Sequence, residues 1–228
     1  MKKKLFSLSL IITCLATIST GTLAFFQAKD VAHNVITSGG VDIDLVEKAE
    51  NPDEDPNDPT DDFIDFEDVD GIVPGQDVSK IVYVQNTGAS DAWVRIRADV
   101  SITLADGTEG SIDVLTIDYN KADWIYKADA EGTGYWYYKD PLPPPTQPES
   151  GDPVIAETTP LFTKVTFIPD MDNSYQGCTT RIDVSAQAVQ VANNPMKENE
   201  DPTIDDVLEA AGWPGETPAA PETETEAE

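Results

Sequence analysis

The chain has 228 residues, with 14 Lys and Arg against 43 Asp and Glu, which gives a formal net charge of −29 at pH 7. A surface this acidic repels DNA, RNA and anionic membranes, so the composition argues against nucleic-acid partners. The acids gather in a few segments and 39% of the residues are hydrophobic, which favours one folded domain of ordinary size with acidic loops and a tail.

Residues 1–24 have the pattern of a secretion signal that is removed during export. Three lysines follow the first residue, an uncharged and largely apolar run covers Leu5–Ile18, and small residues fill most of Ser19–Ala24. The apolar run is shorter than the ~20 residues that span a bilayer, which favours a cleavable leader over a permanent anchor. The predicted cleavage lies between Ala24 and Phe25.

Removal of the leader changes both the charge and the cysteine count. The mature chain loses three lysines, so its net charge falls from −29 to −32. It also loses Cys14, so Cys178 remains alone and an internal disulfide is excluded. Lipid attachment at Cys14 is the weaker alternative, because the residue before it is Thr13 and the site lies inside the apolar run.

Residues 25–40 form an N-terminal segment that cleavage would set free. The segment is too short to build a core of its own, yet it carries the apolar residues Phe25, Phe26, Val31, Val35 and Ile36. A loose apolar strand pairs with an available sheet edge, so these residues are a candidate donor strand for another copy of the chain. The alternative is that the segment folds back as the first strand of its own domain.

Residues 41–200 show the alternation of a β domain. The clearest strand has Val94, Ile96 and Ala98 on an apolar face, and Arg95 and Arg97 on a mostly polar face. Strands are predicted at Val41–Leu45, Ile81–Val84, Val94–Ile102, Ser111–Tyr119, Asp123–Lys127, Tyr135–Lys139, Leu161–Ile168 and Arg181–Val191. Short strands separated by turn residues predict an all-β fold, an antiparallel two-sheet sandwich, with an up-and-down barrel as the alternative.

Four segments fall outside the predicted sheets. Residues 51–62 and 141–153 are rich in proline and are expected to form solvated loops. Residues 201–215 predict a short helix, capped by Thr203 and docked on the sandwich together with Trp213; its shared face holds Ile204, Val207, Leu208 and Ala211. Residues 216–228 predict a disordered acidic tail.

Several motifs appear in an order that is similar to one known family. They are Gly21-Thr22-Leu23-Ala24-Phe25-Phe26, Ser38-Gly39-Gly40-Val41-Asp42-Ile43-Asp44-Leu45, Val73-Pro74-Gly75-Gln76, Val84-Gln85-Asn86-Thr87-Gly88, Asp91-Ala92-Trp93-Val94-Arg95-Ile96, Tyr135-Trp136-Tyr137-Tyr138, Thr159-Pro160-Leu161-Phe162 and Ile182 to Gln190. Over about residues 20 to 213, this order resembles the TasA and camelysin (CalY) family of exported proteins.

The resemblance implies a fold, a location and a function. The fold would be a jelly-roll-like sandwich, and a SipW-type signal peptidase would release the protein to the extracellular matrix or cell surface of a Gram-positive-type bacterium. The function would be that of a structural protein of the biofilm matrix, a fibre subunit in which one copy adds its N-terminal strand to the next. Its partners would be copies of itself and a homologous anchor or matrix protein.

Camelysin-like proteins have been described as metalloproteases, so a metal site needs separate consideration. A zinc site requires three or four His, Cys or carboxylate ligands, and His33 is the only histidine in the sequence. Serine-nucleophile motifs and phosphate-binding glycine loops are also absent from the sequence. We therefore expect a protein that is not an enzyme, with a secreted metalloprotease or a monomeric surface binding module as the alternatives.

Two residue groups have a functional and a structural interpretation. The acidic run contains candidates for weak calcium binding at Asp53, Asp55, Asp58 and Asp61, but it fails the EF-hand pattern because the sixth position is Asp58 rather than glycine. No other cofactor is expected. The aromatic residues between Trp124 and Tyr138 resemble a carbohydrate platform, but consecutive aromatics on a strand point to both faces, which favours a structural role for most of them.

Overall fold

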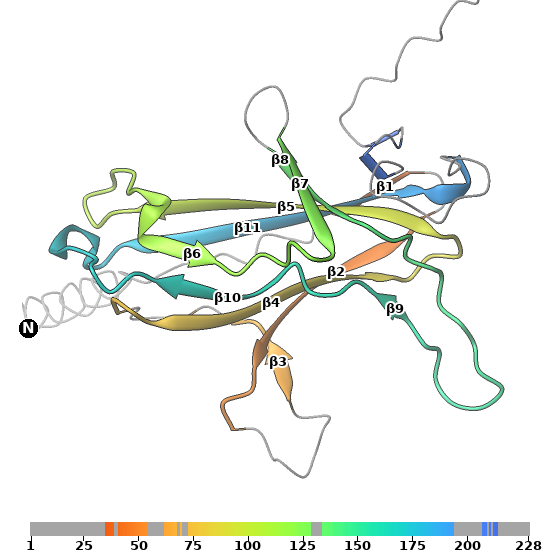
Figure 1. Ribbon diagram of the computed structural model, residues 1–228. Coiled ribbons are helices and arrows are strands. Elements are labelled where there is room, and N and C mark those ends of the chain that lie inside the picture. The colour runs from red at the N-terminus through yellow and green to blue at the C-terminus, as the bar shows by residue number, and fades with distance from the viewer. Residues whose placement is uncertain are drawn as a thin grey trace, which may run out of the picture.

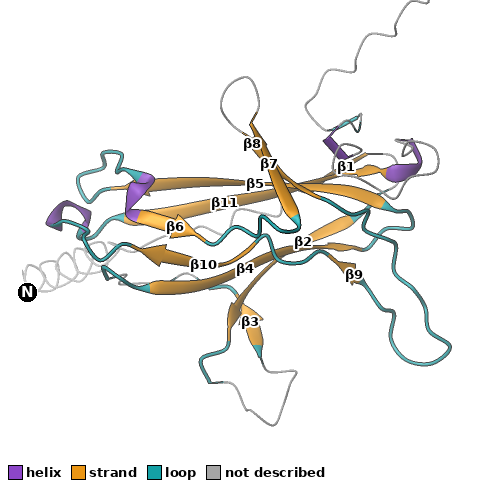
Figure 2. Cartoon of the chain, viewed as in Figure 1, coloured by secondary structure: helices purple, strands orange, loops and turns teal. Residues whose placement is uncertain are grey.

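The computed structural model shows a sandwich of two β-sheets, which confirms the predicted all-β fold. Figure 1 shows the long strands of the two sheets running in two layers, and Figure 2 shows that helical structure is confined to short segments outside them. The structure describes residues 35–38, 41–53, 62–67, 69, 73–128, 134–193, 207, 208, 210, 212 and 213.

The first sheet has five strands in the order β1-β11-β5-β8-β7. Its strands are β1 (Val35–Ser38), β5 (Ala92–Thr103), β7 (Trp124–Ala128), β8 (Gly134–Tyr138) and β11 (Thr179–Gln190). The central pair is long, because β5 and β11 stay in antiparallel register over all twelve residues of each strand. These two strands are the long central strands of the upper layer in Figure 1.

The second sheet has six strands, with the order β3-β2-β4-β10-β6 and a short strand β9 paired with β4. Its strands are β2 (Ile43–Glu50), β3 (Phe63–Asp65), β4 (Asp77–Asn86), β6 (Leu115–Ile117), β9 (Ala156–Glu157) and β10 (Phe162–Phe167). Three 3₁₀ turns complete the described elements: η1 (Ile112–Val114), η2 (Asn173–Tyr175) and η3 (Val191–Asn193).

The core lies between the two sheets, where alternate residues of the long strands meet. On β5, Val94 and Ile96 are fully buried and pack against residues of the opposite sheet such as Val82 and Val84. A second cluster fills the end of the sandwich near η1 and contains Ile102, Val165, Phe167 and Cys178. The alternation read from the sequence thus selects the buried face correctly for β5.

A partly buried ion pair lies beside this apolar interior. Lys80 and Glu47 lie two residues from the core residues Val82 and Leu45 on the same strands, and Lys80 Nζ donates to the Glu47 carboxylate. Lys80 is only 5% exposed, and its ammonium group lies 3.8 Å from the centre of the Phe66 ring. The charge is therefore matched by a carboxylate and an aromatic face, as burial of an ammonium requires.

The predicted strand at Ser111–Tyr119 is mostly wrong. Its first part is the 3₁₀ turn η1, and only Leu115–Ile117 forms a strand. The reason is local, because the Ser111 hydroxyl accepts a hydrogen bond from the Asp113 N–H and caps the turn. Residues 141–153 form the expected loop, which carries only the isolated bridges Ala92–Leu142 and Thr146–Val154.

The outer face of the five-stranded sheet also departs from the expected polar surface. Arg95 is 1% exposed and Trp93 is fully buried, because Val207, Ala210 and Trp213 cover them. Val207 and Leu208 are helical, whereas the other positions of the predicted helix and the whole predicted tail lie outside the described residues or outside helix. We call the described residues Val207, Leu208, Ala210, Gly212 and Trp213 the C-terminal segment. This segment covers part of the outer face of the five-stranded sheet as a third layer.

Candidate assembly edge of the five-stranded sheet

One edge of the first sheet is formed by β1, which makes the only parallel pair among the described strands. Val35 lies opposite Ala186 and Ser38 lies opposite Val189, so β1 covers four residues of β11. β1 comes before all other described strands, and its partner β11 is the last of them. This edge therefore depends on a contact between segments that are far apart in the sequence.

The remaining part of the same β11 edge is open among the described strands. All twelve residues of β11 pair with β5 on one side, but Thr179–Ser185 pair with no described strand on the side of β1. The inward side chains along β11, such as Val184 and Ala186, are buried in the core. An unpaired row of backbone N–H and C=O groups is a template for a further strand.

A charged pair lies on this open stretch. The Arg181 Nε–H donates to Asp183 Oδ1 at 2.5 Å, and both side chains are more than a third exposed. The neighbouring strand β5 carries a similar pair, in which Arg97 Nε donates to Asp99 Oδ2 at 2.7 Å. Positive charges are scarce in this chain, so Arg181, although it is paired with Asp183, is one of few cationic side chains that a negatively charged partner strand could approach.

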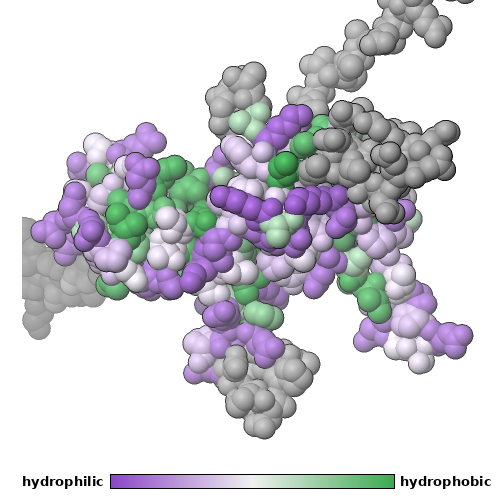
Figure 3. Space-filling view, viewed as in Figure 1, coloured by the Kyte–Doolittle hydropathy of each residue, from purple (hydrophilic) through white to green (hydrophobic). Residues whose placement is uncertain are grey.

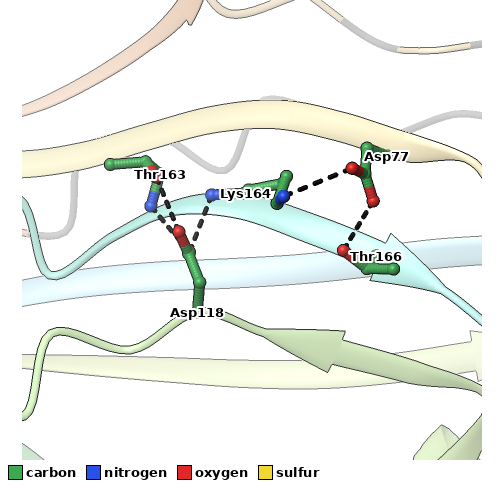
Figure 4. Close-up of polar contacts among 5 residues, drawn as sticks. All are labelled: Asp77, Asp118, Thr163, Lys164 and Thr166. Atoms are coloured by element: carbon green, nitrogen blue, oxygen red, sulfur yellow. Dashed lines mark hydrogen bonds and ion pairs between the residues drawn. The ribbon is translucent and has the colours of Figure 1, made fainter.

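The opposite sheet closes one of its edges with a carboxylate. Where β6 ends, Asp118 Oδ1 accepts hydrogen bonds from the backbone N–H groups of Thr163 (2.9 Å) and Lys164 (2.8 Å), and Oδ2 accepts from the Thr163 hydroxyl at 2.6 Å. Figure 4 shows this carboxylate held against β10. Its donors are groups that another strand would otherwise bind, so this stretch of β10 is less open to strand addition.

A second carboxylate joins β10 to β4. Asp77 accepts a hydrogen bond from the Thr166 hydroxyl at 2.6 Å, and its other oxygen lies 3.2 Å from Lys164 Nζ (Figure 4). The hydrogen bond from Thr166, followed by the one from Lys164, lowers the pKa of Asp77 below its ordinary value. Asp118 thus links the end of β6 to β10, and Asp77 links β4 to β10. Acidic side chains therefore stabilise the pairing of strands in this sheet.

The aromatic residues between Trp124 and Tyr138 are largely structural, as predicted. Trp124, Trp136 and Tyr138 are buried in the main core, and Tyr137 is buried on the outer face under the C-terminal segment. Only Tyr126 is strongly exposed, at 47%. The two-residue period therefore divides the aromatics between two apolar layers, and they do not form one continuous platform.

Exposed apolar side chains are scattered over several parts of the described surface. Figure 3 shows an apolar region over η1 and β6, where Ile112 is 51% exposed. Phe63 on β3 and Val154 in the long loop are also more than half exposed. None of these residues belongs to the β1–β11 edge.

The predicted donor residues divide between described and undescribed parts of the chain. Val35 and Ile36 lie in β1, opposite Ala186 and Gln187. The predicted cleavage site at Ala24 and Phe25, and the donor residues Phe26 and Val31, lie outside the described residues, as does His33. The structure therefore brings two of the five donor residues to the β11 edge.

The calcium candidates are described only at one end of the acidic run. The Asp53 N–H donates to the Asn51 side chain at 3.0 Å in a turn, whereas Asp55, Asp58 and Asp61 lie outside the described residues. In the part of the chain that the structure describes, no group of three or more His, Cys, Asp or Glu residues is arranged to hold a metal ion. Weak calcium binding stays a prediction.

Cys178, the cysteine that remains after the predicted cleavage, is buried in the second core cluster. It is 6% exposed, and burial raises the pKa of its thiol. A buried neutral thiol reacts slowly, so Cys178 serves as an apolar core residue here.

Sequence reasoning did not find the partner of β1 or the Arg181–Asp183 pair on the open part of β11. The alternation in residues 181–191 predicted the strand, but nothing in its sequence distinguishes the edge that faces β5 from the edge that faces β1. Pairing between distant segments becomes visible only once both sheets are assembled.

Among the described residues, no helix is both long enough and apolar enough to cross a membrane.

Comparisons with other proteins add no further assignment. The sequence matches no protein-family model, and no curated protein is similar enough to count as a match.

Proposed function

We propose that the mature chain is an extracellular structural subunit that assembles head to tail by exchange of its N-terminal strand. In this proposal a signal peptidase cuts between Ala24 and Phe25 during export, and the chain reaches the cell surface or the extracellular matrix. Its partners are further copies of itself, with a homologous anchor or matrix protein as a second class. The observation that carries the proposal is the parallel edge strand β1 beside an open stretch of β11.

The register of β1 specifies how a longer donor strand would run. Val35 pairs with Ala186, so a strand that continues in the same parallel register places Val31 opposite Ile182 and Asp30 opposite Arg181. Ile182 packs against both clusters of the core, and Arg181 is half-exposed. The apolar donor residue thus meets the core, and the donor carboxylate meets the arginine.

The sequence between β1 and β2 suits an exchange of this strand. Gly39 and Gly40 separate Ser38 at the end of β1 from the residues that lead into β2. A glycine pair adopts backbone conformations that other residues rarely reach, so it can direct the strand either to its own sheet or to a neighbouring copy. A strand given to the next copy makes a heterologous contact, and such contacts form filaments when the ring does not close.

The first test removes the N-terminal part of the donor strand, residues 25–34, and keeps β1 with the folded domain. Mature protein that begins at residue 25 is compared with protein that begins at residue 35, by light scattering and electron microscopy. The proposal predicts that the longer protein forms filaments and that the shorter one stays monomeric. Equal assembly of the two proteins contradicts strand exchange.

A charge exchange tests the register without shortening the chain. Arg181→Glu places two acids opposite each other in the donor–acceptor pair and is expected to slow assembly ~5-fold, in line with the ~1 kcal/mol of a partly exposed ion pair. Asp30→Lys in the same chain restores an opposite-charge pair and is expected to recover the rate.

The matched control is Arg97→Glu. This substitution makes the same change in net charge and breaks the similar Arg97–Asp99 pair on β5, away from the β1 edge. It is expected to slow assembly less than Arg181→Glu does. Adding Asp30→Lys to it is not expected to raise the assembly rate. Equal effects of the two substitutions, with no recovery, would exclude this register.

A further inference from the structure

The outer face of the five-stranded sheet is covered by a short segment from the end of the chain. In a two-layer sandwich the outer faces normally meet water and are polar. Here Trp93, Tyr137 and Val189 point outward and are nevertheless buried, together with Val207 and Trp213 of the C-terminal segment. The sheet therefore keeps an apolar outer patch that the C-terminal segment shields from water.

Trp213 makes the most specific contacts of this segment. Its ring meets the Tyr137 ring edge-to-face, with centroids 5.6 Å apart and planes at 85°. The Arg95 guanidinium lies 4.5 Å from the Trp213 ring and 3.9 Å from the Tyr135 ring, so it is held between aromatic groups. Both geometries are attractive contacts of an aromatic ring.

The same network reaches the β11 residues that carry β1. Arg95 Nε donates to the Gln187 side chain at 2.8 Å, and Gln187 lies opposite Ile36 of β1. Val189, which packs in the cluster with Trp213, lies opposite Ser38. The outward side chains at the β1 pairing site are therefore fixed by contacts that include the C-terminal segment.

Two features favour opening of this segment. Among the described residues, the buried indole N–H groups of Trp93 and Trp213 find no hydrogen-bond partner, and a buried unsatisfied donor costs free energy that water would return on opening. The described part of the segment also forms no strand pairing with the sheet. Apart from the packing, the contact with the sheet is a long, exposed hydrogen bond from Lys127 Nζ to the Leu208 carbonyl oxygen at 3.5 Å. Elements with few backbone hydrogen bonds to the rest of the fold are among the first to open locally.

We propose that Val207, Leu208, Ala210 and Trp213 act as a latch on the outer face of the five-stranded sheet and limit the release of β1 from β11. Opening of the latch exposes the patch around Trp93 and Tyr137 and loosens the β11 residues that pair with β1. The expected effect on filament growth rests on the proposed function. The expected effect on the release of β1 concerns one subunit alone and does not require assembly. Release of the latch is thus a control point for strand exchange.

The test compares Trp213→Ala with Trp213→Phe in the mature chain, by hydrogen exchange of the backbone amides measured with mass spectrometry. The alanine variant is expected to speed exchange in Val35–Ser38 and Ala186–Val189 by about tenfold. The phenylalanine variant keeps a ring against Tyr137 and removes an unsatisfied N–H group, so its exchange is expected to stay close to that of the original chain. Exchange in Ile43–Lys48 of β2 should be equal in all proteins, which shows that the sandwich remains folded.

One further substitution in the latch gives an independent check. Val207→Ala removes two methyl groups from the same apolar layer and is expected to speed exchange at β1 in the same direction but less. Fast exchange around Tyr137 together with unchanged exchange at β1 would overturn the latch. Faster β1 exchange in Trp213→Ala without filaments from any of these proteins would support the latch and contradict the proposed function.

Discussion

At the scale of single residues, acidic side chains stabilise this fold by accepting hydrogen bonds across strands and turns. Asp118 binds two backbone N–H groups of β10, and Asp123 accepts from the Asn120 amide at 3.0 Å and the Thr159 hydroxyl at 2.8 Å. These hydrogen bonds, first from Asn120 and then from Thr159, lower the pKa of Asp123. The acidity of the sequence therefore has a structural role besides its effect on solubility.

Asp118→Ala measures the contribution of one such carboxylate. The substitution removes the acceptor for Thr163 N–H, Lys164 N–H and the Thr163 hydroxyl, so the free energy of unfolding is expected to fall by about 1–2 kcal/mol. Chemical denaturation monitored by tryptophan fluorescence gives this value. Asp152→Ala is the control, because Asp152 lies exposed in the long loop, and a loss equal to that of Asp118→Ala would show that only charge matters.

At the scale of elements, alternation in the sequence predicted the long strands and also the strands β7 and β8. It missed β3 and β9, which are too short to show a period, and both side chains Phe63 and Ile64 of β3 are exposed. It also misassigned the outward side of β5, because Trp93 and Arg95 become buried only when a distant segment covers them. Local pattern identifies a strand, whereas burial of its second face depends on tertiary contacts.

β1 shows the same limit at the candidate site. Its apolar residues predicted strand pairing, and both pairing within the chain and pairing with another copy stayed open. The structure places Val35–Ser38 on β11 of the same chain. A parallel partner that comes at the other end of the domain leaves no local trace in the sequence, so neither its identity nor its register was predictable.

At the scale of the whole molecule, net charge opposes association. In the proposed assembly, copies of the cleaved chain with a charge near −32 would repel one another, and this repulsion is screened over about 8 Å at physiological ionic strength. The proposed contact between Asp30 of one copy and Arg181 of the next would be a local attraction against that background. Conditions that reduce the negative charge or screen it are therefore expected to promote assembly.

The pH dependence of assembly and that of stability are expected to separate. Protonation of ordinary carboxylates as the pH falls from 7 toward about 4.5 reduces repulsion, so light scattering should show faster assembly. Asp77, Asp123 and Asp172 have folded-state pKa values below 3.8, so their stabilising contributions are complete above that value and are lost as the pH falls through the lowered pKa values. Thermal unfolding should therefore show a falling Tm below about pH 4.

Salt supplies the matching control at constant protonation. Raising NaCl at pH 7 screens the same repulsion without titrating any carboxylate, so assembly is expected to accelerate while the Tm changes little. An assembly rate that is independent of both salt and pH would show that charge repulsion does not limit association.

The most direct measurement is a disulfide between copies at the predicted register. In a Cys178→Ser background, one protein carries Val31→Cys and a second carries Ile182→Cys, and the two are mixed, assembled and oxidised under mild conditions. Strand exchange predicts disulfide-linked heterodimers between the two proteins, identified by mass spectrometry, and few links when Ile182→Cys is replaced by Ser101→Cys on β5. Assembled material without disulfide links between the Val31→Cys protein and the Ile182→Cys protein would contradict the account.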